Sequence, residues 1–231
     1  MQPDAELHEH SHADVSGGWL RAAVFGAMDG LVTNTALVAG VGGGGAAAHT
    51  VVLSGVASLV AGAVSMALGE YTSVTTQNEQ LELEVAKERR ELARNPEGER
   101  RELVELLRDR GVDDDLAEAV SVQLSRDPET ALRLHVVAEI GLNPEDRPSP
   151  RVAAVSSFAT FSVGAVVPLL PYLFGVSTLW VALVCGGLGL VAAGALSARF
   201  TPRPWWWSAL RQLLFGAVAA GATYLIGSAI G

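Results

Sequence analysis

A carboxylate inside a long apolar run stands out among the residues of this sequence. Asp29 lies within the apolar stretch 19–41, and no Lys or Arg lies one helical turn from it. A charged side chain at the centre of a membrane-spanning helix costs about 2.5–3.5 kcal/mol, so it usually marks an ion or proton pathway. The plainer interpretation is an aspartate that hydrogen-bonds across helices. Thr33 and Asn34 add oxygen atoms to the same run.

Two further candidate ligands lie in a second apolar run, 51–71. Met66 offers a thioether, which suits iron(II) better than magnesium or calcium, although a methionine in a helix more often fills core space. Glu70 follows four residues later, so the two side chains share one helix face. With Asp29 and Asn34 they form a candidate ion path.

Paired ligand residues recur between positions 75 and 150. Side chains three or four residues apart share a helix face, and three such pairs occur: Glu88 with Glu91, Glu99 with Glu102, and His135 with Glu139. Carboxylates with an imidazole suit iron(II), manganese(II) or zinc(II). The alternative is a solvated helical surface whose acids pair with nearby arginines, of which there are four: Arg90, Arg94, Arg101 and Arg108.

The elements that must position these residues follow from the uneven distribution of charge. The chain has 231 residues, of which 49% are hydrophobic, and a net charge of −9. Residues 75–151 hold 19 acidic and 12 basic side chains, whereas the rest of the chain holds 6 and 4. Such a chain is a membrane protein with one polar insert. Its acidic surface excludes nucleic acid as a partner and favours cations.

Five apolar runs are long enough to cross a bilayer as helices: 19–41, 51–71, 152–174, 178–198 and 206–230. We expect an all-α polytopic membrane protein with five transmembrane helices. The expected domains are an N-terminal tail (1–18), helices one and two (19–74), a cytoplasmic helical metal-binding insert (75–150) and helices three to five (151–231).

The insert holds most of the basic residues, which places it and the N-terminus in the cytoplasm and the C-terminus outside. Because the start of the chain resembles no targeting segment, we expect the cell membrane of a prokaryote. Within the insert we expect four helices: one continuing from helix two to Arg94, one begun by Asn95 and Pro96, one capped by Asp113, and one begun by Asp127 and ended by Gly141.

The N-terminal tail and the single cysteine give less information about function. His8, His10 and His12 alternate with acids, which is typical either of a weak metal-collecting tail or of a disordered end. Cys185 is the only cysteine, so it forms no internal disulfide.

The membrane motifs resemble those of the vacuolar iron transporter family. They are the run 27–34 (AMDGLVTN) followed by 36–40 (ALVAG), the run 62–67 (GAVSMA) with Gly69, Glu70 and Tyr71, and the run 168–172 (PLLPY). The resemblance covers nearly the whole chain.

The resemblance implies a homodimer that exports iron(II), and often manganese(II), from the cytoplasm in exchange for protons. It implies that Asp29 and Met66 line the path at the dimer interface. It also implies a metal-binding domain whose ligands here are Glu88, Glu91, Glu99, Glu102 and Glu139. Where the family pattern has a methionine one turn before the last glutamate, this chain has His135, whose imidazole still ligates iron(II) but makes the site more sensitive to pH.

We therefore expect a metal transporter and not an enzyme, with no permanent cofactor. Iron(II) or manganese(II) would be both its cargo and its regulatory ion, and its partners would be the bilayer, protons and a second copy of the chain. One alternative is a membrane sensor that binds metal without moving it. Another is a membrane di-iron oxidase, which needs paired Glu-x-x-His motifs; outside the N-terminal tail this sequence has none.

Overall fold

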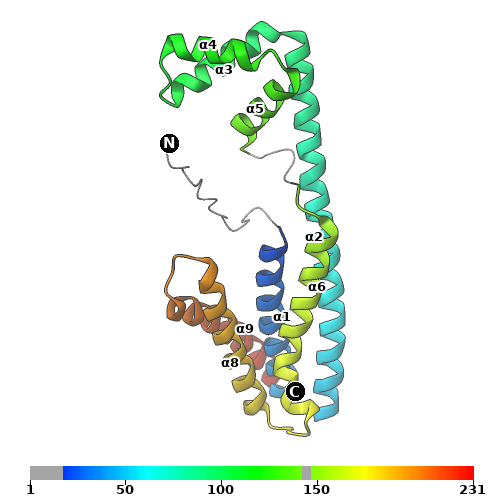
Figure 1. The fold of residues 1–231 in the computed structure, drawn as a ribbon. Helices are drawn as coiled ribbons and strands as arrows, with labels where there is room; N and C mark the ends of the chain where they lie inside the picture. Colours follow the sequence, from blue (N-terminus) through cyan, green and yellow to red (C-terminus); the bar gives the residue numbers. More distant parts are fainter. Residues whose placement is uncertain (1–17, 142–146) are drawn as a thin grey trace, which may run out of the picture. The chain divides into compact units, whose positions relative to one another are not determined.

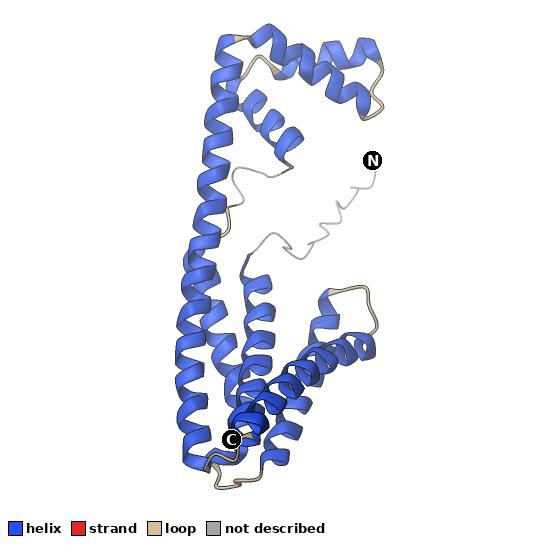
Figure 2. Cartoon of the chain, turned by 180° about the vertical axis from the view of Figure 1, so that it is seen from behind, coloured by secondary structure: helices blue, strands red, loops and turns tan. Residues whose placement is uncertain are grey.

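The structure, a computed structural model, describes residues 18–141 and 147–231, and all regular structure in these ranges is helical (Figures 1 and 2). The three N-terminal histidines, His8, His10 and His12, lie outside the described residues. So does part of the link between the insert and the third membrane helix.

The elements follow one another as α1 (Gly18–Gly43), α2 (Ala48–Arg94), α3 (Pro96–Asp109), α4 (Asp114–Leu124), α5 (Pro128–Ile140), α6 (Pro150–Val166), η1 (Val167–Leu169), α7 (Leu170–Leu173), α8 (Leu179–Ser197), η2 (Ala198–Phe200) and α9 (Trp205–Ile230). Five helical segments in the described residues are long and apolar enough to cross a membrane: Gly18–Gly43, Ala48–Arg94, Pro150–Leu173, Leu179–Phe200 and Trp205–Ile230. The predicted all-α class with five spanning helices is confirmed.

The chain separates into two compact units. Unit 1 comprises Met1–Ala67, described from residue 18 onward, together with Val152–Gly231; unit 2 comprises Leu68–Arg151. Unit 1 holds the spanning segments and unit 2 the charged insert. The helix α2 runs unbroken from one unit into the other, as the sequence predicted.

In unit 1, α1 packs backbone to backbone against α6. A Cβ atom at Gly30 would lie 2.2 Å from the carbonyl oxygen of Phe161, and one at Gly164 would lie 2.3 Å from that of Ala27. Both distances are far below van der Waals contact, so only glycine fits. Membrane helices associate through such close approaches of small residues, because apolar burial gives them no advantage over lipid.

Asn34 joins three helices in the middle of this packing. Its side chain is fully buried, and Nδ2 donates to Gly55 O on α2 (3.2 Å) and to Ala165 O on α6 (2.8 Å). Because an unsatisfied polar group in a membrane interior costs several kcal/mol, these bonds fix the positions of α1, α2 and α6 relative to one another.

The third spanning segment contains a 3₁₀ turn, a detail that the apolar run 152–174 did not predict. It begins at Pro150, tightens into the 3₁₀ turn η1, and ends as the short helix α7. Pro168 and Pro171 explain the change, since each lacks the backbone N–H that would continue the ladder and its ring clashes with the preceding turn.

In unit 2, capping side chains, prolines and one glycine set the helix ends. The Asn95 side chain accepts from Gly98 N (3.1 Å) at the start of α3, and Asp127 accepts from Thr130 N (3.2 Å) at the start of α5. Gly141 ends α5 with φ of +73°. Asp113 lies at the start of α4 as predicted but makes no capping hydrogen bond there.

A small apolar core holds α5 against α2. Leu81 on α2 is buried with Leu132 and Val136 on α5, and Val85 and Leu92 pack around them. At the exposed start of α5, the Glu129 carboxylate accepts two hydrogen bonds from the Arg89 guanidinium of α2 (2.9 and 3.1 Å). These contacts determine which face of α5 meets α2, and that face carries His135.

Candidate metal centre

Three helices of unit 2 bring their acidic side chains together around one imidazole. Glu88 lies near the end of α2, Glu99 near the start of α3, and His135 and Glu139 one turn apart on α5. Asn95 ends α2 and caps α3, so Glu99 follows Glu88 after one tight turn and comes within 3.7 Å of His135 Nδ1. The apolar core between α2 and α5 then directs His135 toward both glutamates.

The ligand atoms are close enough to share one cation. His135 Nδ1 lies 3.3 Å from Glu88 Oε1, 3.7 Å from Glu99 Oε2 and 3.8 Å from Glu139 Oε1. One ligand atom each from Glu88, His135 and Glu139 lie within 4.8 Å of one another. A divalent ion with oxygen and nitrogen ligands at about 2.0–2.2 Å fits between such atoms after small side-chain movements.

Two atoms of this cluster are buried without a hydrogen-bond partner. His135 is 1% exposed and Glu88 5% exposed, and neither His135 Nδ1 nor Glu88 Oε1 makes a hydrogen bond despite their 3.3 Å separation. Buried polar atoms in native proteins are nearly always satisfied, so each exception needs an explanation. A bound cation satisfies both atoms at once, so the residues present fit a divalent metal.

The electrostatics point the same way. The pKa of Glu88 is raised to about 7, chiefly by burial and then by the negative charges of Glu139, Glu99, Glu91 and Glu102, in that order. Burial likewise raises the pKa of Glu99, helped by Glu102 and opposed by His135. Carboxylates crowded in this way repel one another unless a cation or a proton neutralises them.

Glu91 and Glu102 contribute charge from the edge of the cluster. Both side chains are exposed, and both act on Glu88 and Glu99 through their charge. The structure thus gathers the six residues that the sequence paired. Glu88, Glu99 and His135 are buried, Glu139 reaches His135 from an exposed position, and Glu91 and Glu102 lie at the edge.

Asp29 and Met66 occupy half-buried positions in unit 1. Asp29 Oδ1 accepts a long hydrogen bond from Thr33 Oγ1 (3.4 Å), one turn along α1. Met66 packs on α2 beside the buried trio of Ala63, Phe161 and Ala165. Glu70, one turn further along α2, belongs to unit 2 and is also half-buried.

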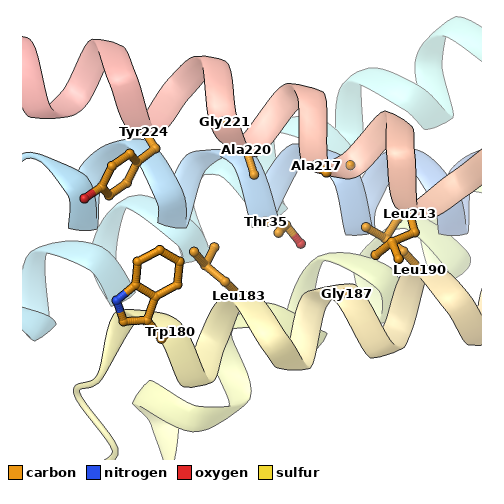
Figure 3. A pocket seen from close by; sticks show the side chains of 11 residues that line it. Thr35, Trp180, Leu183, Gly187, Leu190, Leu213, Ala217, Ala220, Gly221 and Tyr224 are labelled. Atoms are coloured by element: carbon orange, nitrogen blue, oxygen red, sulfur yellow. The ribbon is translucent and has the colours of Figure 1, made fainter.

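An apolar cavity of about 300 Å³ lies between α1, α8 and α9 (Figure 3). Its lining consists of Thr35, Trp180, Leu183, Gly187, Leu190, Leu213, Gly216, Ala217, Ala220, Gly221 and Tyr224. These side chains offer a metal ion no carboxylate, imidazole or thioether. The cavity is therefore not a metal site.

Comparison with known proteins places the sequence in a family. The model of the VIT family matches residues 20–228. The chain belongs to the VIT family. It is 35% identical to a vacuolar iron transporter of Acanthamoeba castellanii, over 98% of this chain and 84% of that protein. It is 31% identical to vacuolar iron transporter 1 of Oryza sativa subsp. japonica (98% and 92%), and 34% identical to VIT-like transporter 1b of Glycine max (89% and 73%).

Family membership and the spanning helices together make the chain a multi-pass membrane protein, as predicted. The family resemblance read from the sequence is also confirmed. The relatives named here come from an amoeba and two plants, so a prokaryotic cell membrane stays a prediction.

One contact in this VIT family chain was not anticipated from the sequence. Gln212 on α9 is buried, and its Nε2 lies 2.8 Å from the sulfur of Met28, the neighbour of Asp29. The available signal was a lone glutamine in an apolar run, since polar residues in spanning helices usually face other helices. The contact links α9 to the part of α1 that carries the aspartate.

Proposed function

We propose that this chain exports a divalent metal ion from the cytoplasm, iron(II) first and manganese(II) second, in exchange for protons. The named relatives are iron transporters, which supports iron as cargo. A single observation supports the transport step. Asp29 is a half-buried carboxylate in a spanning helix, and it accepts a hydrogen bond from a neutral hydroxyl of its own helix, that of Thr33. A protein that only sensed metal would have no use for this charge inside the membrane.

In this proposal the centre of Glu88, Glu99, His135 and Glu139 collects the ion. Crowded, buried carboxylates bind a divalent cation and release protons as they do so. The imidazole selects for iron(II) and manganese(II) over magnesium and calcium, which prefer oxygen ligands.

The ion then passes along Glu70, Met66 and Asp29. Glu70 and Met66 lie one turn apart on α2, the helix that also carries Glu88. Asp29 and Glu70 each exchange a proton for the cation, which gives antiport a chemical basis. We assign Asn34 a place beside this path. Its side-chain Nδ2 donates two hydrogen bonds that hold α1, α2 and α6 together, and its Oδ1 has no hydrogen-bond partner.

We further propose that the working unit is a homodimer. In one chain Asp29 and Met66 are only half-buried, and an open groove runs between α1 and α9 beside Thr33. A carboxylate is costly on a surface that faces hydrocarbon. A second copy packed over this face of α1 would remove Asp29 from lipid and enclose the path.

The test is metal uptake into sealed liposomes that hold the purified protein. We expect iron(II) and manganese(II) to enter with wild-type protein and not with Asp29→Ala. The matched control is Glu84→Gln, an exposed glutamate of α2 that pairs with Lys87 away from the centre. Uptake by Asp29→Ala at the wild-type rate would exclude the proposed path. Binding of metal by wild-type protein without any uptake would favour the sensor.

A further inference from the structure

Three arginines of unit 1 make no ion pair with any residue that the structure describes. Arg199 and Arg203 lie in the segment between α8 and α9, and Arg211 lies on α9. All three are exposed. Within the described residues none of them pairs with a carboxylate, and residues 152–231 contain no Asp or Glu at all. Within the part of the chain that the structure describes, these three guanidinium groups are therefore open to an anion from outside the protein.

The surroundings of these arginines place them at the level of lipid headgroups. Phe200, Trp205, Trp206 and Trp207 are between 46% and 63% exposed around the same link. Tryptophan concentrates at the boundary between hydrocarbon and water, where its ring is half solvated. The first turn of α9 has no acidic residue and no side-chain cap, so its N-terminal end adds partial positive charge.

Arg211 lies on α9 itself, beyond the link. It lies six residues after Trp205, which is about 9 Å along the helix axis. It shares a face of α9 with Trp207, four residues before it, and the exposed Leu214 lies one turn beyond. An arginine on such a lipid-facing surface bends its side chain toward the headgroup layer, and the anions there are phosphates.

An apolar pocket next to the link offers room for a chain of the same lipid. Its volume is about 200 Å³, and it lies between α1, α6, α8 and η2. Its lining is Leu20, Ala23, Val24, Ala27, Met28, Thr160, Ala193, Leu196, Ser197 and Phe200. Phe200 and Ser197 border the pocket on either side of Arg199 in the sequence.

We propose that the link between α8 and α9 binds an anionic phospholipid. Arg199, Arg203 and Arg211 hold its phosphate and headgroup, and the pocket beside Phe200 takes part of an acyl chain. Three cations without a carboxylate partner favour a lipid of net negative charge over a zwitterionic one. Each arginine near an anionic lipid surface strengthens binding about fivefold.

The test is native mass spectrometry of the full chain in detergent, titrated with phosphatidylglycerol or phosphatidylcholine. We expect phosphatidylglycerol to bind at least tenfold more tightly. Replacing all three arginines by glutamine should weaken its binding about a hundredfold. The control replaces three exposed arginines of unit 2 by glutamine, Arg94, Arg110 and Arg126, and should keep wild-type affinity.

Two other measurements keep the test decisive. If the triple variant does not fold, each single variant should still lose about fivefold in affinity for phosphatidylglycerol. Wild-type protein should also unfold at a higher temperature with phosphatidylglycerol than with phosphatidylcholine. Free glycerol phosphate should not displace the lipid, since it has no acyl chain for the pocket. Equal affinity for the two lipids, equal loss in the control, or displacement by glycerol phosphate would each overturn the proposal.

Discussion

At the residue scale, His135 and Glu88 are the main residues of the candidate metal centre, because both are buried and both leave a polar atom unsatisfied. The sequence placed each of them in an i,i+3 or i,i+4 pair. It did not show that the histidine would lie among glutamates from three helices. That arrangement depends on the face of α5 that meets α2, which Leu132 and Val136 decide by packing on Leu81.

Metal binding to the centre should depend on pH. Since the pKa of Glu88 is raised to about 7, the carboxylate is protonated below that pH and the metal must displace a proton. We expect manganese(II) affinity to rise from pH 6 to pH 8, by up to about tenfold for each unit below the pKa. Isothermal titration calorimetry of the full chain in detergent measures this. Equal affinity at pH 6 and pH 8 would contradict the ligand role of Glu88.

The same group should affect stability when metal is absent. A carboxyl whose folded pKa lies near 7 and whose ordinary value is 4.5 binds its proton more tightly in the folded state. Stability without metal therefore falls as pH rises from about 4.5 through 7. Glu88→Gln removes this cost, so at pH 8 the chelated variant should unfold at a temperature several degrees higher than wild type. The variant should also lose most of the stabilisation that manganese gives wild type, whereas Glu84→Gln should behave as wild type in both respects.

At the scale of elements, the ends of helices were the most predictable features. Asn95 with Pro96, Asp127 with Pro128, and Gly141 set helix ends through local hydrogen bonds and backbone angles that their residue types favour. Packing between helices was not predictable in the same way. A glycine in an apolar run shows that close approach is possible, but not which helix approaches it.

The contact between α1 and α6 should not tolerate a single added methyl group. At Gly164 a Cβ would lie 2.3 Å from Ala27 O, so Gly164→Ala must push the helices apart. We expect a drop of several degrees in unfolding temperature, measured by tryptophan fluorescence in detergent. The control is Gly221→Ala on α9, where a Cβ would meet nothing within 4 Å. An unchanged unfolding temperature in Gly164→Ala would show that the two helices do not pack this closely.

Asn34 and Asp29 lie near each other on α1 but should respond differently to replacement. Asn34→Ala leaves the carbonyls of Gly55 and Ala165 without their donors, which costs about 1–3 kcal/mol. Asp29→Ala removes one weak hydrogen bond and a costly charge, so its unfolding temperature should match or exceed that of wild type. Thermal unfolding in detergent separates the two. Destabilisation by Asp29→Ala as large as that by Asn34→Ala would make the aspartate a structural residue.

At the scale of the whole molecule, the topology in the membrane follows from the five spanning helices. With an odd number of spans we expect the two termini on opposite sides of the membrane, and the insert on the opposite side from the segment between α7 and α8. This prediction came from counting apolar runs and basic residues, because hydropathy reports spans directly. The pairing of two chains is not encoded in such counts.

The topology has a direct test, because Cys185 is the only native cysteine. In a Cys185→Ala background, Ser125→Cys reports the insert and Ser177→Cys reports the segment between α7 and α8, and both positions are exposed. We expect a membrane-impermeant maleimide to label Ser177→Cys, and not Ser125→Cys, in intact cells. Labelling of both from the same side would exclude the five-span arrangement.

The central claim is that divalent metal crosses the membrane against protons through Asp29. The most direct measurement records manganese(II) influx and internal pH together in one population of proteoliposomes, for wild type and for Asp29→Asn. The account predicts manganese entry with matching proton exit in wild type, and loss of both in the variant while its insert still binds manganese. Equal manganese entry in the two proteins, or entry without proton movement in wild type, would contradict it.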